Sequence, residues 1–237
     1  MDCNDSDGSD MKIRPIHPKR RIQVRCLLLC TFVLFNFYSG VAAADALSDL
    51  RTAVVEGDAE GVTTALSQGV NVDAVIARKR GSTALIVAAQ KGLPGIVKLL
   101  LKAGANIEFA NKRGRRALHR SIWGSLDAMK VLLEAGANVN AADNRGNQTL
   151  NMAAYENRSA MVKLLIKAGA DMRAGNERNN TPLHHAAERG SLYALRILIA
   201  AGADLNVENE AGETPLAVAT EHNRSAAAEL LEKAGGK

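Results

Sequence analysis

The chain has 237 residues, of which 30 are basic, 25 are acidic and only 3% are aromatic. Residues 1–44 carry six basic and four acidic residues, so the formal charge of +5 falls to +3 for residues 45–237. This small excess does not favour nucleic acid as a partner, and the three cysteines (Cys3, Cys26 and Cys30) all precede residue 45, which excludes disulfides and cysteine chemistry beyond that point.

Residues 1–44 have the layout of a secretory signal peptide. A basic stretch (residues 12–25) precedes an apolar stretch (residues 26–41), and an alanine triplet ending at Ala44 fits the small-residue cleavage pattern. The apolar stretch is short for a membrane span. We therefore expect export, with cleavage after Ala44, to a periplasm or, alternatively, to the exterior. An uncleaved leader that anchors the protein through residues 26–41 stays open, and the acidic start favours Met11 as the true first residue.

A glycine recurs along residues 45–237 at intervals of 32 to 35 residues. It is followed by alanine in four places, beginning at Gly104, Gly136, Gly169 and Gly202, and Gly69 and Gly235 extend the series. A period of this size marks a chain built from stacked copies of one small unit. The sequence predicts one domain over 45–237 with six units, at about 45–77, 78–110, 111–142, 143–175, 176–208 and 209–237.

The fifth unit opens with Thr181-Pro182-Leu183-His184 and continues with Ala186-Ala187, and Thr214-Pro215-Leu216 repeats the opening. This pattern resembles the ankyrin repeat. The resemblance implies an all-α solenoid of about six helix-turn-helix repeats joined by short finger turns. It also implies a protein that binds other proteins and has no catalytic activity.

The residues of each unit give the physical reasons for two short helices. Thr before Pro is a favourable helix start, because Thr can cap the first turn and Pro needs no N–H there. Seven residues after the opening Leu stands a residue that tolerates the left-handed conformation that ends a helix. These residues are Gly57, Gly92, Asn157, Gly190 and Asn223. A second helix with aliphatic residues at helical spacing comes next and ends at the recurring glycine.

Two units depart from the period. Two residues are added near Val75-Ile76-Ala77, in the loop before the second unit, where insertions cost little. The third unit lacks one residue between Leu118 and Gly124, and a deletion inside a helix rotates the remainder of that helix by about 100°. We expect Trp123 either to face solvent on the inner surface or to fill a local packing gap.

The resemblance implies that a partner contacts the finger turns and the inner face of the first helices. Basic residues concentrate there in the second and third units, and Trp123 and Tyr155 lie in the middle. Because Trp, Tyr and Arg dominate binding hot spots, we expect a partner protein with an acidic patch. An alternative is that these charges only keep the finger tips solvated. The candidate partner-binding residues are Lys79, Arg80, Lys91, Lys112, Arg113, Arg115, Trp123, Arg145, Tyr155, Arg178 and Arg189.

No sequence motif for phosphate binding, zinc hydrolysis or a nucleophilic serine occurs, so we predict no enzyme, cofactor, metal or small-molecule substrate. His119 and His184 occupy the repeat's own His position, which implies that they brace the finger turn. We expect a monomeric adaptor, stabiliser or inhibitor of a partner protein. A membrane-tethered scaffold, an effector or immunity factor directed at another cell, and an activity hidden in the groove are the alternatives.

Overall fold

A computed structural model describes residues 45–237, in which Asp45–Lys237 form one compact unit. The predicted signal peptide, its cleavage after Ala44 and the start at Met11 lie outside the described residues and stay predictions. Within residues 45–237, no helix combines the length and apolar character that a membrane crossing requires.

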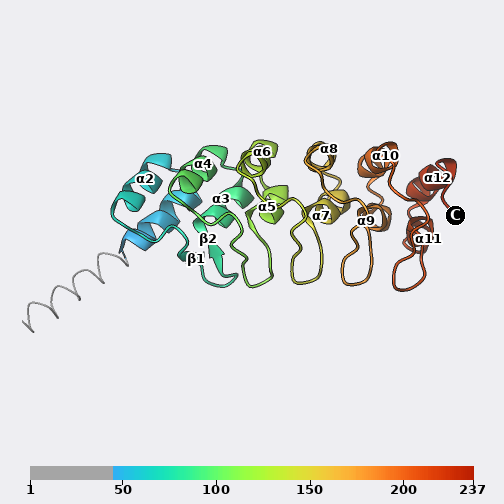
Figure 1. Cartoon of the computed structure of the whole chain (residues 1–237), viewed down its shortest axis with the longest axis horizontal. Helices are drawn as coiled ribbons and strands as arrows, with labels where there is room; N and C mark the ends of the chain where they lie inside the picture. Colours follow the sequence, from blue (N-terminus) through green and yellow to red (C-terminus); the bar gives the residue numbers. More distant parts are fainter. Residues whose placement is uncertain (1–44) are drawn as a thin grey trace, which may run out of the picture. The chain divides into compact units, whose positions relative to one another are not determined.

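The domain consists of short helices in two rows (Figure 1). One row holds α3 (Ala84–Lys91), α5 (Ala117–Arg120), α7 (Thr149–Tyr155), α9 (Pro182–Arg189) and α11 (Pro215–Glu221). The other holds α2 (Ala59–Ser67), α4 (Pro94–Lys102), α6 (Leu126–Glu134), α8 (Ser159–Lys167), α10 (Leu192–Ala200) and α12 (Ser225–Lys233). Residues 45–56 are also helical, and a 3-10 helix, η1 (Ser121–Trp123), comes after α5. The predicted all-α solenoid is confirmed.

The helix ends follow the glycine and asparagine pattern. Asn157 and Asn223 have φ values of 52° and 55°, and Gly92 and Gly190 have values of 72° and 73°. All four lie in the left-handed region, which explains why only glycine and asparagine occupy this position in the described repeats other than the shortened third one.

Threonine precedes proline at two helix starts, and its hydroxyl caps one of them. Thr214 Oγ1 accepts a hydrogen bond from the Ala217 N–H at 3.3 Å. At Thr181 the hydroxyl instead lies 2.8 Å from Nδ1 of His184. At the start of α3, where Thr83 precedes alanine, the buried threonine hydroxyl has no partner. The histidine side chain competes for the threonine hydroxyl where the repeat carries a His.

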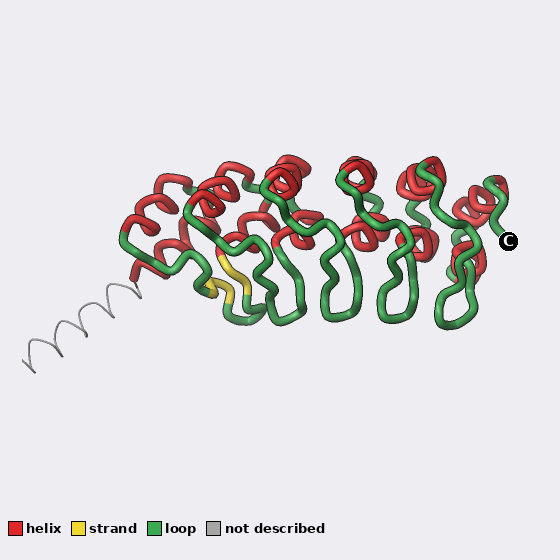
Figure 2. The backbone as a smooth tube through the Cα atoms, viewed as in Figure 1, coloured by secondary structure: helices red, strands yellow, loops and turns green. Residues whose placement is uncertain are grey.

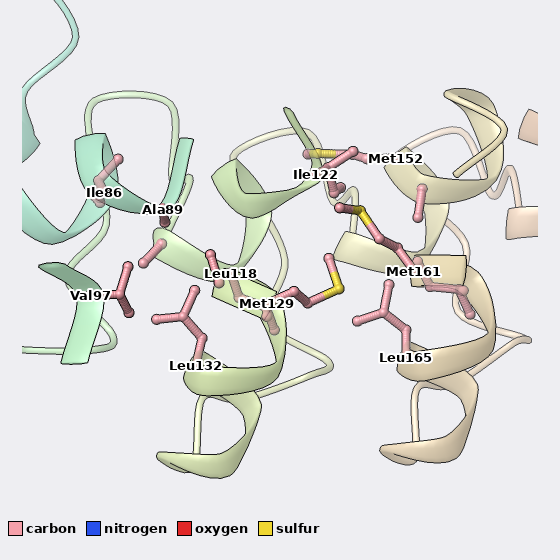
Figure 3. Close-up of a cluster of buried hydrophobic side chains, with 14 of the residues drawn as sticks. Ile86, Ala89, Val97, Leu118, Ile122, Met129, Leu132, Met152, Met161 and Leu165 are labelled. Carbon is pink, nitrogen blue, oxygen red and sulfur yellow. The ribbon is translucent and has the colours of Figure 1, made fainter. Parts of the chain in front are cut away.

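The core lies between successive helix pairs (Figure 3). Leu85, Leu150 and Leu183, which open their repeats, are almost fully buried, and so are the alanine pairs that come after them. Small alanine side chains allow the helices of adjacent repeats to approach closely. Each repeat therefore buries its apolar face against its neighbours, as expected of a solenoid.

The fingers project on one side of the helices (Figure 2) and are joined to one another by backbone hydrogen bonds. The N–H groups of Lys112, Asn144, Glu177 and Glu210 donate to the carbonyl oxygens of Arg80, Arg113, Arg145 and Arg178, respectively, at 3.0–3.1 Å. The two residues added near Val75–Ala77 extend the first finger into an antiparallel pair, β1 (Val75–Ala77) with β2 (Ser82–Thr83). The finger tips are thus held in register along the domain.

The missing residue of the third repeat divides its first helix. The α-helical part stops after four residues at Arg120, and a 3-10 turn carries the chain to Trp123. A 3-10 helix has three residues per turn, so residues i and i+3 lie one above the other. Trp123 is 36% exposed, which agrees with the expectation that it faces solvent rather than filling a gap.

Candidate functional site

A groove of about 610 Å³ runs across the third, fourth and fifth repeats. Finger residues form one wall, and residues of η1, α7 and α9 contribute the rest of the lining. Most of the lining is polar, with two aromatic side chains and one methionine. The lining residues are Arg115, Trp123, Arg145, Asn147, Asn151, Met152, Tyr155, Glu156, Asn176, Glu177, Arg178, Asn180, His185 and Glu188.

Both aromatic side chains of the groove are in contact with arginines. The guanidinium of Arg120 lies 4.6 Å from the centre of the Trp123 ring, and that of Arg115 lies 5.6 Å from it. The Arg189 guanidinium lies 5.5 Å from the centre of the Tyr155 ring. These distances are within the range of cation–π attraction. Trp123 and Tyr155 remain partly exposed beside these arginines.

Two residues that line the groove, Met152 and His185, share a repeat position with Arg120, which lies against Trp123, and the sequence analysis did not select this position. Arg120, Met152 and His185 each stand two residues after the opening Leu of their repeats. Arg120 and Met152 are buried and His185 is half-buried, and the His185 ring meets Tyr155 edge-on at 6.2 Å. The spacing of 32 and 33 residues, together with the three-residue step to Trp123 and Tyr155, was the signal that could have identified them.

Arg120 is a buried cation without a counter-ion. It is 8% exposed, and within residues 45–237 its side chain forms no ion pair or hydrogen bond. Burial, together with the charges of Arg80, Arg115 and Arg113, lowers the pKa of Arg120 to about 10. The electrostatic field around Arg120, beside Trp123, is therefore positive.

Arg115 differs from its neighbours because it has an acidic partner within the domain. Its Nε donates to Oδ2 of Asp143 at 3.1 Å. Oδ1 of the buried Asp143 accepts from the backbone N–H groups of Arg145 and Asn147 at 2.9 and 3.1 Å. Arg115 thus joins the third finger to the fourth, and Asp143 largely neutralises its charge.

Arg116, which replaces the usual capping threonine, also has partners within the domain. Its Nε lies 2.9 Å from Oε2 of Glu108, and Nη1 donates to the Ala142 carbonyl at 3.0 Å. The residue links three segments of the stack. This structural role accounts for its departure from the repeat pattern.

The structure divides the predicted partner-binding residues into three sets. Arg115, Trp123, Arg145, Tyr155 and Arg178 line the main groove. Lys79 and Arg80 line a separate hollow of about 500 Å³ in the first two repeats, beside the exposed Val55. Lys91, Lys112, Arg113 and Arg189 are exposed and line neither cavity.

Charge changes sign along the stack. A third hollow, of about 580 Å³, is lined by Glu188, Glu210, Glu213 and Glu221 together with Arg178 and two histidines. Hydrogen bonding from Asn209 lowers the pKa of Glu213. The stack therefore has a basic end at its second and third repeats and an acidic end at its fifth and sixth.

The two repeat histidines behave differently. Nδ1 of His184 accepts from the Thr181 N–H at 3.2 Å, and Nε2 lies 3.0 Å from the Glu213 carbonyl oxygen. Because a carbonyl oxygen only accepts, we assign the proton to Nε2. The predicted bracing is confirmed for His184. His119 Nδ1 accepts from the Arg116 N–H at 3.2 Å, whereas its Nε2 interacts only weakly with the Asn147 backbone, so the bracing is weaker in the shortened repeat.

Burial keeps these imidazoles neutral. It lowers the pKa of His119 and of His185 to about 4, and it lowers that of His184. Nearby Asp143 partly opposes the shift at His119. In the part of the chain that the structure describes, no three His, Cys, Asp or Glu side chains gather in a way that could hold a metal ion.

Stacked helix pairs, projecting fingers and an open polar groove define the chain as a helical-repeat binding module. A family model described as "Ankyrin repeats (3 copies)" matches residues 50–143 and again residues 150–237. The chain therefore belongs to the ankyrin-repeat family, whose members are protein–protein interaction modules and are generally non-catalytic scaffolds. A search of curated proteins returned no match.

Proposed function

We propose that this protein is an exported, non-catalytic ankyrin-repeat protein that binds an acidic surface of one partner protein and thereby positions, stabilises or inhibits it. The observation that carries the proposal is the gathering of three arginines, two of which form no ion pair within residues 45–237, around two partly exposed aromatic rings. Such a combination offers both steering by charge and anchoring by aromatic contact.

The finger tips support this function because an arginine recurs at one position of successive fingers. Arg80, Arg113, Arg145 and Arg178 occupy equivalent places in four successive fingers, and their side chains lie at the surface of the stack. Within residues 45–237 none of them forms an ion pair. Their backbone carbonyls are fixed by the next finger, so the row of side chains starts from a rigid base. A partner with regularly placed carboxylates fits this row.

Charge reversal of three tip residues tests the proposal. We expect Lys112→Glu, Arg113→Glu and Arg145→Glu together to reduce recovery of the partner protein at least about tenfold in quantitative affinity capture at physiological salt. Arg115 is left unchanged because reversing it would place two carboxylates side by side at Asp143. The capture uses an envelope fraction, with mass spectrometry comparing the two baits protein by protein.

The matched control reverses three cations on the outer helices. Lys98→Glu, Lys163→Glu and Arg196→Glu change the net charge equally but lie on α4, α8 and α10. We expect this variant to recover the same partner as the unchanged protein. Equal loss with both triple variants would show that net charge alone governs the binding and would refute the proposed face.

Export is supported by the basic and apolar pattern of residues 12–41 and by the alanine triplet. We expect the purified protein to begin at Asp45 when its N-terminus is sequenced. Retention of residues 26–41, with the protein in the membrane fraction, would instead establish a tethered scaffold. Recovery of the processed protein from the medium would favour an effector or immunity factor.

A further inference from the structure

Arg120 stands out because it is the one arginine of the basic end that is buried and has no partner in residues 45–237. Its neighbours Arg80, Arg113 and Arg115 add positive charge, and only Arg115 is compensated, by Asp143. Burying a cation in this way is unfavourable unless an anion joins it. The folded domain therefore holds a buried positive charge that no acidic side chain of residues 45–237 neutralises.

We propose that Arg120, held against Trp123, forms a subsite for the carboxylate of a Glu or Asp side chain on the partner protein. This inference rests on the proposed function and names the group that the basic end of the stack recognises. Arg80 and Arg113, which are close enough to affect the charge of Arg120, flank the subsite.

The 3-10 turn of the third repeat produces the arrangement. Arg120 ends α5 and Trp123 ends η1, so the three-residue step places the ring over the guanidinium at 4.6 Å. Stacking on an aromatic face leaves the N–H groups at the edge of a guanidinium available for a two-bond contact with a carboxylate. Among the buried and unpartnered side-chain nitrogens and oxygens of residues 45–237, none belongs to Arg120, so its nitrogens still reach solvent.

The remainder of the groove favours a polypeptide carboxylate over a free phosphate. Met152 and Tyr155 provide an apolar floor next to Trp123 in the same groove. The amides of Asn147, Asn151 and Asn176 are hydrogen-bonded within the domain, so this floor is the part of the groove that a bound polypeptide would contact. An apolar surface does not contribute to the binding of an inorganic anion. The experiment must therefore distinguish the binding of a carboxylate from the binding of a phosphate.

Trp123 is the sole tryptophan of the chain, so its fluorescence reports on this subsite alone. We expect a deca-glutamate peptide to change the Trp123 emission in a saturable way, whereas deca-glutamine has no effect. In Arg120→Met the dissociation constant for deca-glutamate is expected to rise at least about tenfold. Arg120→Lys, which keeps the charge but loses the planar two-bond contact, is expected to weaken binding several-fold.

Arg196→Met is the matched control, since it removes one exposed positive charge on α10 far along the chain. We expect its affinity for deca-glutamate to equal that of the unchanged protein. Equal weakening in Arg196→Met and Arg120→Met, or an equal response to pyrophosphate at matched charge and ionic strength, would overturn the carboxylate subsite.

A second readout keeps the inference testable apart from binding. Methionine already stands at the equivalent place in the fourth repeat, at Met152, so Arg120→Met fits the repeat and removes an unpaired buried charge. We therefore expect the variant to melt at a higher temperature than the unchanged protein, as measured by circular dichroism. A lower melting temperature would assign Arg120 a structural role and would refute the subsite.

Different experimental outcomes would refute the proposed subsite and the proposed function. If Arg120→Met still recovers the partner protein as well as the unchanged bait, the subsite is wrong and the binding function stands. If deca-glutamate binding depends on Arg120 but the charge-reversed fingers recover the same proteins as their control, the subsite stands and the proposed binding face is wrong.

Discussion

Between pH 7 and pH 4 the free energy of unfolding of the repeat domain is expected to fall by about 6 kcal/mol, roughly half of it from each of His119 and His185. Burial lowers the pKa of both imidazoles from 6.5 to about 4. Below pH 6.5 the unfolded chain binds a proton on each histidine, and the folded domain does not until about pH 4. Stability is therefore complete above pH 6.5 and is lost as the pH falls through this window.

Urea unfolding monitored by far-ultraviolet circular dichroism at pH 7, 5.5 and 4 measures this loss. The lowered pKa of His184 acts in the same direction. Glu213 and Glu229 have pKa values below their ordinary value of 4.5, so they also lower stability on acidification, but only once the pH falls below about 5. A midpoint that stays constant from pH 7 to pH 4 would contradict the neutral, buried state of the two imidazoles.

The chain itself supplies the control variant. Asn151 occupies the His119 position in the fourth repeat, where Oδ1 accepts from the Gln148 N–H at 3.1 Å, and Met152 occupies the His185 position. We expect His119→Asn with His185→Met to remove most of the dependence on pH while preserving the fold. Persistence of the full loss in this variant would assign it to other groups.

At the positions that set the repeat period, the helix ends and the core, a single physical requirement determines the residue type. A glycine or asparagine is required where φ is positive, and a leucine is required where a repeat meets its neighbour, so both recur at the period. The resemblance to the ankyrin repeat could therefore be identified from the sequence. Family membership and the all-α architecture agree with it.

Arg120 and the groove residues Met152 and His185 were not predicted, because the repeat position that they share has no constant chemical character. An arginine, a methionine and a histidine occupy the same place in successive repeats at Arg120, Met152 and His185. Only the helical geometry connects each of them with the side chain three residues later on the same face. The contacts of Arg115 and Arg116 were not predicted for another reason, since they reach the next finger, where Arg115 pairs with Asp143 and Arg116 donates to the Ala142 carbonyl.

The shortened third repeat was visible as a gap in the period, but its consequence depends on a tertiary contact. Gly124 comes directly after the 3-10 turn and lies against the end of α3, where Gly92 adopts a φ of 72°. A Cβ atom at Gly124 would overlap the Ala89 carbonyl oxygen and would come within 2.8 Å of the Gly92 nitrogen. Two glycines from adjacent repeats thus allow the backbones to approach where the helix has lost a residue.

Gly124→Ala is for this reason expected to lower the free energy of unfolding by about 3 kcal/mol, as overpacked sites do when the opposing atoms cannot move aside. The atoms that a new Cβ would meet belong to backbone, so rotation of a side chain cannot relieve the overlap. Urea unfolding monitored by circular dichroism measures the loss. Gly95→Ala is the control, because no atom lies within 4 Å of a Cβ there and the site is exposed in the first turn of α4. It is expected to leave stability unchanged or to raise it by about 0.5 kcal/mol.

Gly124→Ala also connects the packing of the third repeat with its binding subsite. The 3-10 turn places Trp123 over Arg120 only if the chain can continue through Gly124 against α3. Forcing the two backbones apart is expected to move the indole from the guanidinium. The Trp123 emission maximum should therefore shift, and the affinity for deca-glutamate should fall even at temperatures where the variant is folded. An unchanged spectrum and affinity together with reduced stability would show that the stack of Trp123 on Arg120 does not depend on this contact between the second and third repeats.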